Sequence, residues 1–274
     1  MCIRDSGKTG LRDATPQLTG AVPLSAEVGE RRLENTPDQV REFDSGVYNT
    51  GSTITWGASG IAGVWAEENT RESIYNAFRR KETFATTGTR IKVRFFGGYG
   101  FTDETLAAPD MLETAYSEGV SMGSDLLSDG DRAPRFIVWA TQDALSAPLQ
   151  RLQIIKGWTV DGEPHEQVFD VACSDGLAVD PQSHRCGDNG AQVNLEDCSI
   201  STDVGAAELK TVWVDPDFDS SVRAFYYARV LENPTCRWST WDALKEGYEP
   251  RPDFPTTIQE RAYTSPIWFR PSTG

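Results

Sequence analysis

The stretch Gly63–Phe96, GVWAEENTRESIYNAFRRKETFATTGTRIKVRFF, decides the fold of this chain. A short apolar run at Ile61–Ala66 leads into it and predicts a strand. Residues Arg71–Arg80 predict a helix, and Arg90–Phe96 predicts a second strand because apolar and charged residues alternate along it. A strand, a helix and another strand in this order indicate that one structural layer ends here and a second one begins.

The predicted helix has its own start signal. Asn69 is suited to the N-cap, because its side chain accepts a hydrogen bond from the free N–H groups of the first turn, and Glu72 completes a capping box. A mostly apolar stripe then follows at the helical spacing i, i+3, i+4 and i+7, namely at Ile74, Ala77, Phe78 and Lys81.

The composition excludes several classes of protein. With 274 residues, eight Trp, eight Tyr and twelve Phe, the chain has enough apolar volume for a packed core. Its net charge of −15 argues against nucleic acid, whose phosphates require Lys and Arg, and against anionic membrane surfaces. No apolar run approaches the ~20 residues that span a bilayer, so we expect no membrane span.

The first six residues, MCIRDS at Met1–Ser6, are interpreted as a translated sequencing adapter; a genuine N-terminus is the alternative. On the adapter interpretation the natural start is missing, and Cys2 does not belong to the native cysteines. Residues 7–60 are polar and rich in Gly, Ser and Thr, which predicts an irregular loop or insertion.

The rest of the chain is predicted to be mainly β. Asp161-Gly162 is typical of a tight hairpin turn between two strands. Seven short strands separated by turn residues predict a two-sheet sandwich. The strands are expected at Arg90–Phe96, Arg135–Ala140, Leu152–Val160, Gln167–Ala172, Glu208–Val214, Val222–Leu231 and Ala262–Phe269.

Four cysteines remain after Cys2 is set aside, and they surround a segment with little apolar content of its own. Two disulfides would staple this segment, and they would imply an exported protein. Three pairings are possible; the first choice pairs Cys186 with Cys198, and leaves Cys173 with Cys236. A four-cysteine zinc site lacks the usual C-x₂-C pair, and free buried thiols are the remaining alternative.

Histidine is scarce, with only His165 and His184 in the chain. A catalytic zinc site with His ligands and a Ser-His-Asp triad are therefore both unsupported. The D-x-D-x-D pattern at Asp215–Asp219 matches the start of a calcium loop, but Ser220 and Tyr226 stand where that loop needs Gly and Glu. We interpret it as an acidic turn between strands.

Two candidate functional residues stand out near the deciding stretch. Glu67 and its neighbour Glu68 follow the end of the first strand, where β/α proteins place their chemistry; the alternative is that both are solvated acids at the helix entry. Arg90 begins the second strand and is a candidate for holding an anionic substrate, with a surface position as the alternative.

Several motifs together resemble one known family. GVWAEENTRESI, RRKETFATTGTRIKVRFF, QRLQIIKGW, DVACSDG, FYYARVLENPTCRWSTWDA and IQERAYTSPIWF resemble the C-terminal half of bacterial proteins of domain-of-unknown-function family 3604, over Val47 to Phe269. Full-length members resemble PHP-type (polymerase and histidinol phosphatase) metal-dependent hydrolases, whose N-terminal part carries His- and Asp-rich metal motifs on a distorted β/α barrel.

The resemblance implies an α+β, mainly β fold. Residues 61–88 would be the terminal strand and helix of a PHP-like β/α barrel, and residues 89–274 an antiparallel β-sandwich with a Cys-rich loop. The H-x-H and Asp-x-His elements of such a barrel are absent from the chain, which agrees with a fragment that has lost its metal-binding half.

The function implied is that of a C-terminal fragment of an exported hydrolase acting on a small phosphate or related ester. We expect divalent metal ions in the full-length protein, none in this fragment, and no activity of the fragment alone. Glu67 is the one position carried over as near the lost metal centre. The alternative is a non-catalytic binding module for a carbohydrate or a protein, in which Trp residues form a stacking platform on an exposed face and mutation of Trp238 or Trp241 would abolish binding. Against it, Trp139, Trp158, Trp213 and Trp268 each lie inside a predicted strand and would belong to the core.

Overall fold

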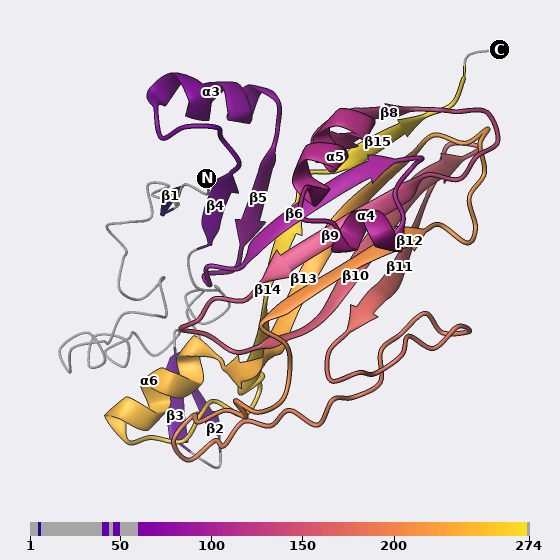
Figure 1. The fold of residues 1–274 in the computed structure, drawn as a ribbon. Coiled ribbons are helices and arrows are strands. Elements are labelled where there is room, and N and C mark those ends of the chain that lie inside the picture. The colour runs from indigo at the N-terminus through magenta and orange to yellow at the C-terminus, as the bar shows by residue number, and fades with distance from the viewer. Residues whose placement is uncertain (1–4, 7–39, 44–45, 50–59, 273–274) are drawn as a thin grey trace.

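The computed structural model describes residues 5–6, 40–43, 46–49 and 60–272. Most of the chain forms two antiparallel sheets that pack face to face (Figure 1). The predictions for residues 1–4, 7–39, 44–45 and 50–59 lie outside the described residues. Within residues 7–60, β2 (Val40–Phe43) and β3 (Gly46–Asn49) pair as an antiparallel hairpin.

The larger sheet has nine strands, in the order β1-β4-β5-β14-β13-β10-β11, and β15 and β8 extend it beside β13. All of its neighbouring strands run antiparallel except β15 and β8, which are parallel. Its strands are β1 (Asp5–Ser6), β4 (Ile61–Val64), β5 (Thr83–Thr86), β8 (Asp125–Leu127), β10 (Leu149–Val160), β11 (Glu163–Cys173), β13 (Ala224–Cys236), β14 (Thr257–Thr264) and β15 (Ile267–Arg270).

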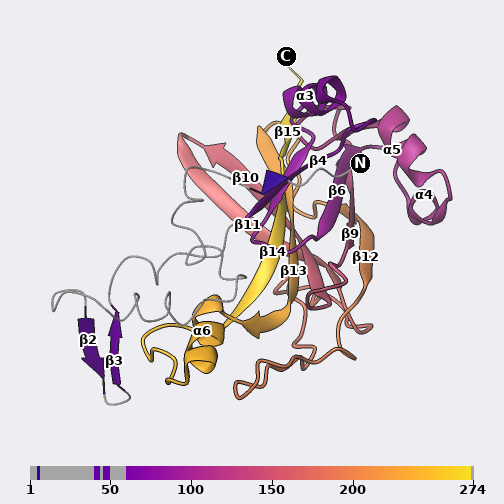
Figure 2. The same ribbon diagram turned by 90° about the vertical axis from the view of Figure 1, so that its left-hand side faces the viewer.

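The smaller sheet has four strands, in the order β12-β9-β6-β7. Its strands are β6 (Lys92–Gly98), β7 (Gly119–Ser121), β9 (Arg135–Thr141) and β12 (Glu208–Val214), and all of their pairings are antiparallel. Figure 2 shows α4 (Asp103–Ala107) and α5 (Met111–Glu118) on the side of this sheet that faces away from the larger one.

The core lies between the two sheets, as the alternation in the sequence predicts. Ile91, Val93 and Phe95 point into it, and Phe95 stacks on Phe136 with ring centroids 5.5 Å apart. On the opposite face of β6, Phe96 packs in a second cluster with residues of α5, and its ring meets Tyr116 edge-on. The mainly β prediction and the two-sheet arrangement are therefore confirmed.

The predicted helix is present as α3 (Arg71–Arg79), but its cap differs from the prediction. Thr70, not Asn69, is the N-cap, and its hydroxyl accepts a hydrogen bond from the backbone N–H of Ser73 at 3.3 Å. The helix begins one residue later than an Asn69 cap requires, so the Asn69–Glu72 capping box does not form. A further helix, α6 (Trp238–Glu246), follows β13.

The last predicted strand is divided in two. Residues 262–269 belong partly to β14 and partly to β15, with Ser265 and Pro266 between them. Pro266 has no N–H to donate to a neighbouring strand, and this ends the ladder of β14. The chain then continues as β15, which pairs with β13 and β8.

The β4–α3–β5 unit, predicted as the end of a barrel, joins the larger sheet directly. β4 pairs with β5, and β5 pairs with β14 from the C-terminal end of the chain. One continuous sheet therefore crosses the predicted boundary between residues 88 and 89. The origin of this unit in a PHP-like barrel stays a prediction.

Two disulfides are present, but the first-choice pairing was wrong. Cys173 is bonded to Cys186, and Cys198 is bonded to Cys236. The loop after β11 folds back on that strand, where the backbone N–H of Cys186 donates to the buried Asp170 carboxylate at 2.8 Å. Cys186 therefore lies beside Cys173. Because all four sulfurs are in disulfides, the zinc and free-thiol alternatives are also wrong.

Candidate ligand-binding site

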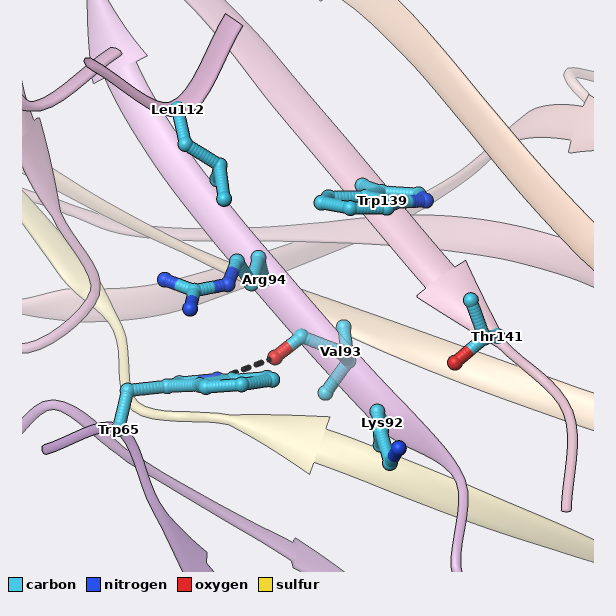
Figure 3. A pocket seen from close by; sticks show the side chains of 7 residues that line it. All are labelled: Trp65, Lys92, Val93, Arg94, Leu112, Trp139 and Thr141. Atoms are coloured by element: carbon cyan, nitrogen blue, oxygen red, sulfur yellow. Dashed lines mark hydrogen bonds between the residues drawn. The ribbon is translucent and has the colours of Figure 1, made fainter. Parts of the chain in front are cut away.

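Two adjoining pockets open between β4, β6 and α5, and we call them together the Trp65 cleft. The first has a volume of about 260 Å³ and is shown in Figure 3; the second has a volume of about 470 Å³. Trp65 and Arg94 line both pockets. The first is also lined by Lys92, Val93, Leu112, Trp139 and Thr141, and the second by Ala66, Glu67, Arg80, Glu82, Tyr116 and Ser121.

Trp65 is fixed by backbone contacts on both sides. Its own N–H donates to the carbonyl of Glu82 at 3.1 Å, which continues the pairing of β4 with the chain before β5. Its indole Nε1 donates to the carbonyl of Val93 at 2.9 Å, drawn as the dashed line in Figure 3. The indole therefore lies across β6 in one orientation.

Arg94 lies between Trp65 and Tyr116. Its guanidinium carbon is 3.7 Å from the Trp65 ring centroid, and its NH1 donates to the Tyr116 hydroxyl at 2.8 Å. Lys92, two residues earlier on β6, extends from the same side of the strand and is exposed. Two cations thus stand beside one indole, and Trp139 on β9 provides a second aromatic wall (Figure 3).

A chain of alternating charges lines the second pocket. Glu82, only 3% exposed, accepts hydrogen bonds from the Tyr116 hydroxyl and from Arg80, the latter at 3.5 Å. Arg80 also bonds Glu67 at 3.0 Å. Although Tyr116 is 45% exposed, partial burial and the hydrogen bond to Glu82 raise its pKa to about 12. Tyr116 is therefore a neutral donor at neutral pH.

The predicted residue Glu67 lies in this cleft, and its carboxylate is held by donors. Its own backbone N–H, the Ser73 hydroxyl at 3.0 Å and Arg80 lower its pKa. The side chain is 70% exposed, so the carboxylate is ionised and in contact with water. Such a group can fix Arg80 but does not have the raised pKa of a general acid. Its catalytic role stays a prediction.

Arg90 lies outside the cleft. Its backbone N–H donates to the Asp143 carboxylate at 2.8 Å, before β6 begins, and its side chain is exposed. The cation that lines both pockets of the cleft is Arg94, which was not among the predicted site residues. The alternation of Lys92 and Arg94 along β6 was the available signal, since it places both on the face opposite Val93. The substrate-binding role of Arg90 stays a prediction.

The other candidate sites have structural roles. Asp215 is buried, and it accepts a hydrogen bond from Tyr226 at 2.7 Å and pairs with Lys156 at 2.6 Å, as an acidic turn rather than a calcium loop. His165 stacks on Trp158, and His184 meets Phe169 edge-on. Across the part of the chain that the structure describes, no group of three or more His, Cys, Asp and Glu residues could hold a metal ion.

These features define the class: a disulfide-bonded, mainly β protein with a cleft of two indoles and clustered cations beside strand β6 of the smaller sheet. Residues 19–271 match the family described as "Protein of unknown function (DUF3604)", and the chain belongs to this family. No curated protein and no solved structure matches the chain. In the described ranges, no helix has the length and apolarity needed to cross a membrane.

Proposed function

We propose that this chain is the substrate-binding part of a metal-dependent hydrolase of the phosphoesterase type. The observation that carries the proposal is Arg94, which is fixed on the Trp65 ring at the border of the two pockets of the Trp65 cleft. Arginine offers a planar set of N–H donors that matches the oxygens of a phosphate group. A small ester with an anionic group is the ligand that suits this position.

The cleft has a complementary surface for both parts of such an ester. Of the three guanidinium nitrogens of Arg94, only NH1 donates a hydrogen bond to a described residue. The N–H groups of the other two are available to a ligand. Lys92 adds a second positive charge beside them. The Trp65 and Trp139 rings offer an apolar wall for the alcohol part of the ester.

The described residues do not provide the ligand set for a catalytic metal ion, and we derive no catalytic step from them. In the full-length protein we expect divalent ions, held by residues outside this chain, to supply the activated water. The two disulfides fit export, and we place the protein in the periplasm or outside the cell. The chain alone should bind the ester without cleaving it.

Binding is tested by calorimetric titration of the 274-residue chain with phenyl phosphate, and with phenol as the uncharged reference. We expect phenyl phosphate to bind more tightly, and Arg94→Gln to weaken it roughly tenfold, as for loss of one charged hydrogen bond. Arg132→Gln is a matched control, because Arg132 also lies over an aromatic ring, that of Tyr99, but outside the cleft. Equal affinities of the wild type and Arg94→Gln would reject the cleft as the binding site.

Catalysis is tested separately. The chain is incubated with bis-p-nitrophenyl phosphate and Mn²⁺, Zn²⁺ or Mg²⁺, and no turnover above the metal alone is expected. Robust metal-dependent turnover would refute the proposal that this chain lacks a complete catalytic centre.

A second candidate is a binding module without catalysis, for a carbohydrate or a protein. The two indoles in one pocket favour it. Of the two indoles named for mutation, Trp238 is only 9% exposed and Trp241 is 43% exposed, so Trp241 is the one that a ligand could reach. This candidate would be favoured if the chain bound uncharged sugars and Trp139→Ala abolished that binding. It also requires that a longer gene product shows no hydrolase activity.

A further inference from the structure

A second basic site lies on the outer face of the larger sheet, away from the Trp65 cleft. Arg151, Arg229 and Arg261 come from the neighbouring strands β10, β13 and β14. Each is adjacent in sequence to a residue of the core between the sheets, Leu152, Val230 and Ala262 respectively. Because side chains alternate along a strand, the three arginines point to the opposite face. We call them, with Arg185, the arginine cluster.

The strand register brings the cluster together. Leu231 pairs with Arg151 on one side and with Arg261 on the other, and Arg229 pairs with Gln153 in the next row. Arg185 comes from the loop that the Cys173–Cys186 disulfide fixes against β11. The cluster is therefore built on rigid strands and a cross-linked loop.

One buried carboxylate lies among these four guanidinium groups. Asp170 is 3.5 Å from NH1 of Arg185 and 3.7 Å from Nε of Arg151. It also accepts from Gln153 at 2.6 Å, and Gln153 in turn accepts from Nε of Arg229 at 2.6 Å. Burial lowers the pKa of Arg151, and the charges of Arg185, Arg229 and Arg261 lower it further against the opposing effect of Asp170. Positive charge is in excess here, in a protein whose net charge is −15.

The cluster has unused donors and space beside them. Nε of Arg151 is buried without a hydrogen-bond partner among the described residues. In the same part of the chain, Arg261 uses only its Nε, which donates to the Gln259 carbonyl at 3.1 Å, and Arg229 only its Nε. An open pocket of about 670 Å³ adjoins Arg151 and Arg261 and is also lined by Gln150, Gln259 and Asp188.

We infer that the arginine cluster binds the sulfate or phosphate group of a ligand, in the pocket beside Arg151 and Arg261. The guanidinium groups of the cluster outnumber the carboxylates beside them, Asp170 and, at the pocket, Asp188. Their remaining planar donors suit the three oxygens of such a group. Tyr227 and Tyr263 are the residues beside Arg229 on this face, and their half-buried rings can support a sugar ring that carries the group. The ligand is either a free oxyanion or a sulfated or phosphorylated carbohydrate.

The test titrates the chain with sodium sulfate and with a heparin hexasaccharide of defined length, by calorimetry at low ionic strength. The Arg229→Gln/Arg261→Gln variant should lose affinity for both probes by more than roughly tenfold, as for charged hydrogen bonds. The Arg132→Gln/Arg270→Gln variant removes the same charge from two exposed ion pairs elsewhere and should bind as the wild type does. Thermal melting checks that each variant is folded; if the double variant is not, Arg261→Gln alone is used, because Arg261 lines the pocket.

Each outcome has a meaning. Hexasaccharide binding that is much tighter than sulfate binding, and sensitive to the cluster variant, supports a carbohydrate ligand; equal binding of the two probes supports a free oxyanion. Absence of binding to both probes overturns the inference. Equal losses in the cluster variant and the control variant also overturn it, because they would show a response to total charge only.

Discussion

Arg94 lies over the indole ring of Trp65, with its guanidinium carbon 3.7 Å from the ring centroid. The indole is anchored in turn on the Val93 carbonyl of the same strand as Arg94. The cation, the ring and β6 therefore form one rigid unit. A ligand that binds this unit does not have to order it, and this preorganisation lowers the entropic cost of binding.

Replacement of the ring should release Arg94. We predict that Trp65→Leu weakens phenyl phosphate binding by roughly tenfold, because loss of a partly desolvated cation–π contact costs about 1 kcal/mol or more. Trp65→Phe keeps a ring but not the indole N–H, and should retain most of the affinity. Calorimetry measures both, with Trp241→Leu as the control because that indole is 43% exposed and lies outside the cleft. An unchanged affinity in Trp65→Leu would contradict the role of the ring.

Glu232 should make stability depend on pH. It is 0% exposed, its Oε2 accepts from the Ser146 hydroxyl at 2.6 Å, and burial raises its pKa from 4.5 to about 7. Because the folded state favours the protonated form, the stabilisation is fully present below pH 4.5 and is lost as pH rises through 7. Its total is on the order of 3 kcal/mol.

The measurement is the free energy of unfolding in urea between pH 4.5 and 8. In the wild type this free energy should fall as the pH rises. Glu232→Gln should remove most of that fall, since glutamine stays neutral at every pH. The control Glu196→Gln changes an exposed carboxylate and should leave the slope as in the wild type. The same decline in wild type and Glu232→Gln would show that another group is responsible.

Local sequence patterns predicted the strands and turns of this fold. They could not predict which residues far apart in the sequence come into contact. The alternation along β6 placed Val93 and Phe95 in the core correctly. The Asp161-Gly162 turn was also predicted correctly, and both residues have the positive φ that such a turn requires, 51° and 85°. The predicted partner of Cys186 was wrong, because the true partner depends on how the loop folds back on Asp170. No sequence pattern encodes that contact.

Prediction of the site residues from the sequence is limited in the same way. Glu67 was selected from its place after β4, and it does line the cleft. Arg94 was not selected, because its contacts come from Trp65 and Tyr116 on two other elements. The strand period gives the face on which a side chain lies, but only the fold shows what else reaches that face.

The two disulfides should differ in their contribution to stability. Cys198 and Cys236 are 38 residues apart in sequence, whereas Cys173 and Cys186 are 13 apart. Since a longer loop loses more unfolded-state entropy on closure, Cys198→Ala/Cys236→Ala should cost about 4 kcal/mol and Cys173→Ala/Cys186→Ala about 3 kcal/mol. Urea unfolding of both double variants under oxidising conditions measures this. A larger loss from the shorter loop would show that native-state contacts of the Asp170 loop decide the difference.

Lys156 and Asp215 form a buried ion pair, and we expect their contributions to the free energy of unfolding to be strongly coupled. Their charged atoms are 2.6 Å apart, and both side chains are nearly inaccessible to water. Asp215 also accepts from the Tyr226 hydroxyl, and Lys156 donates to the Asp217 carbonyl at 2.7 Å. The pair therefore holds the acidic turn after β12 over strands β10 and β13.

Removal of one partner leaves an uncompensated buried charge, so Asp215→Asn should lower the free energy of unfolding by about 3–5 kcal/mol. The double variant Lys156→Met/Asp215→Asn removes both charges and should recover part of that loss. Urea unfolding of the single and double variants gives the coupling energy, and Lys210→Met serves as the control because it breaks an exposed pair with Glu208. If the double variant is as unstable as the sum of its single variants, the two charges are independent and the turn is held by its other hydrogen bonds.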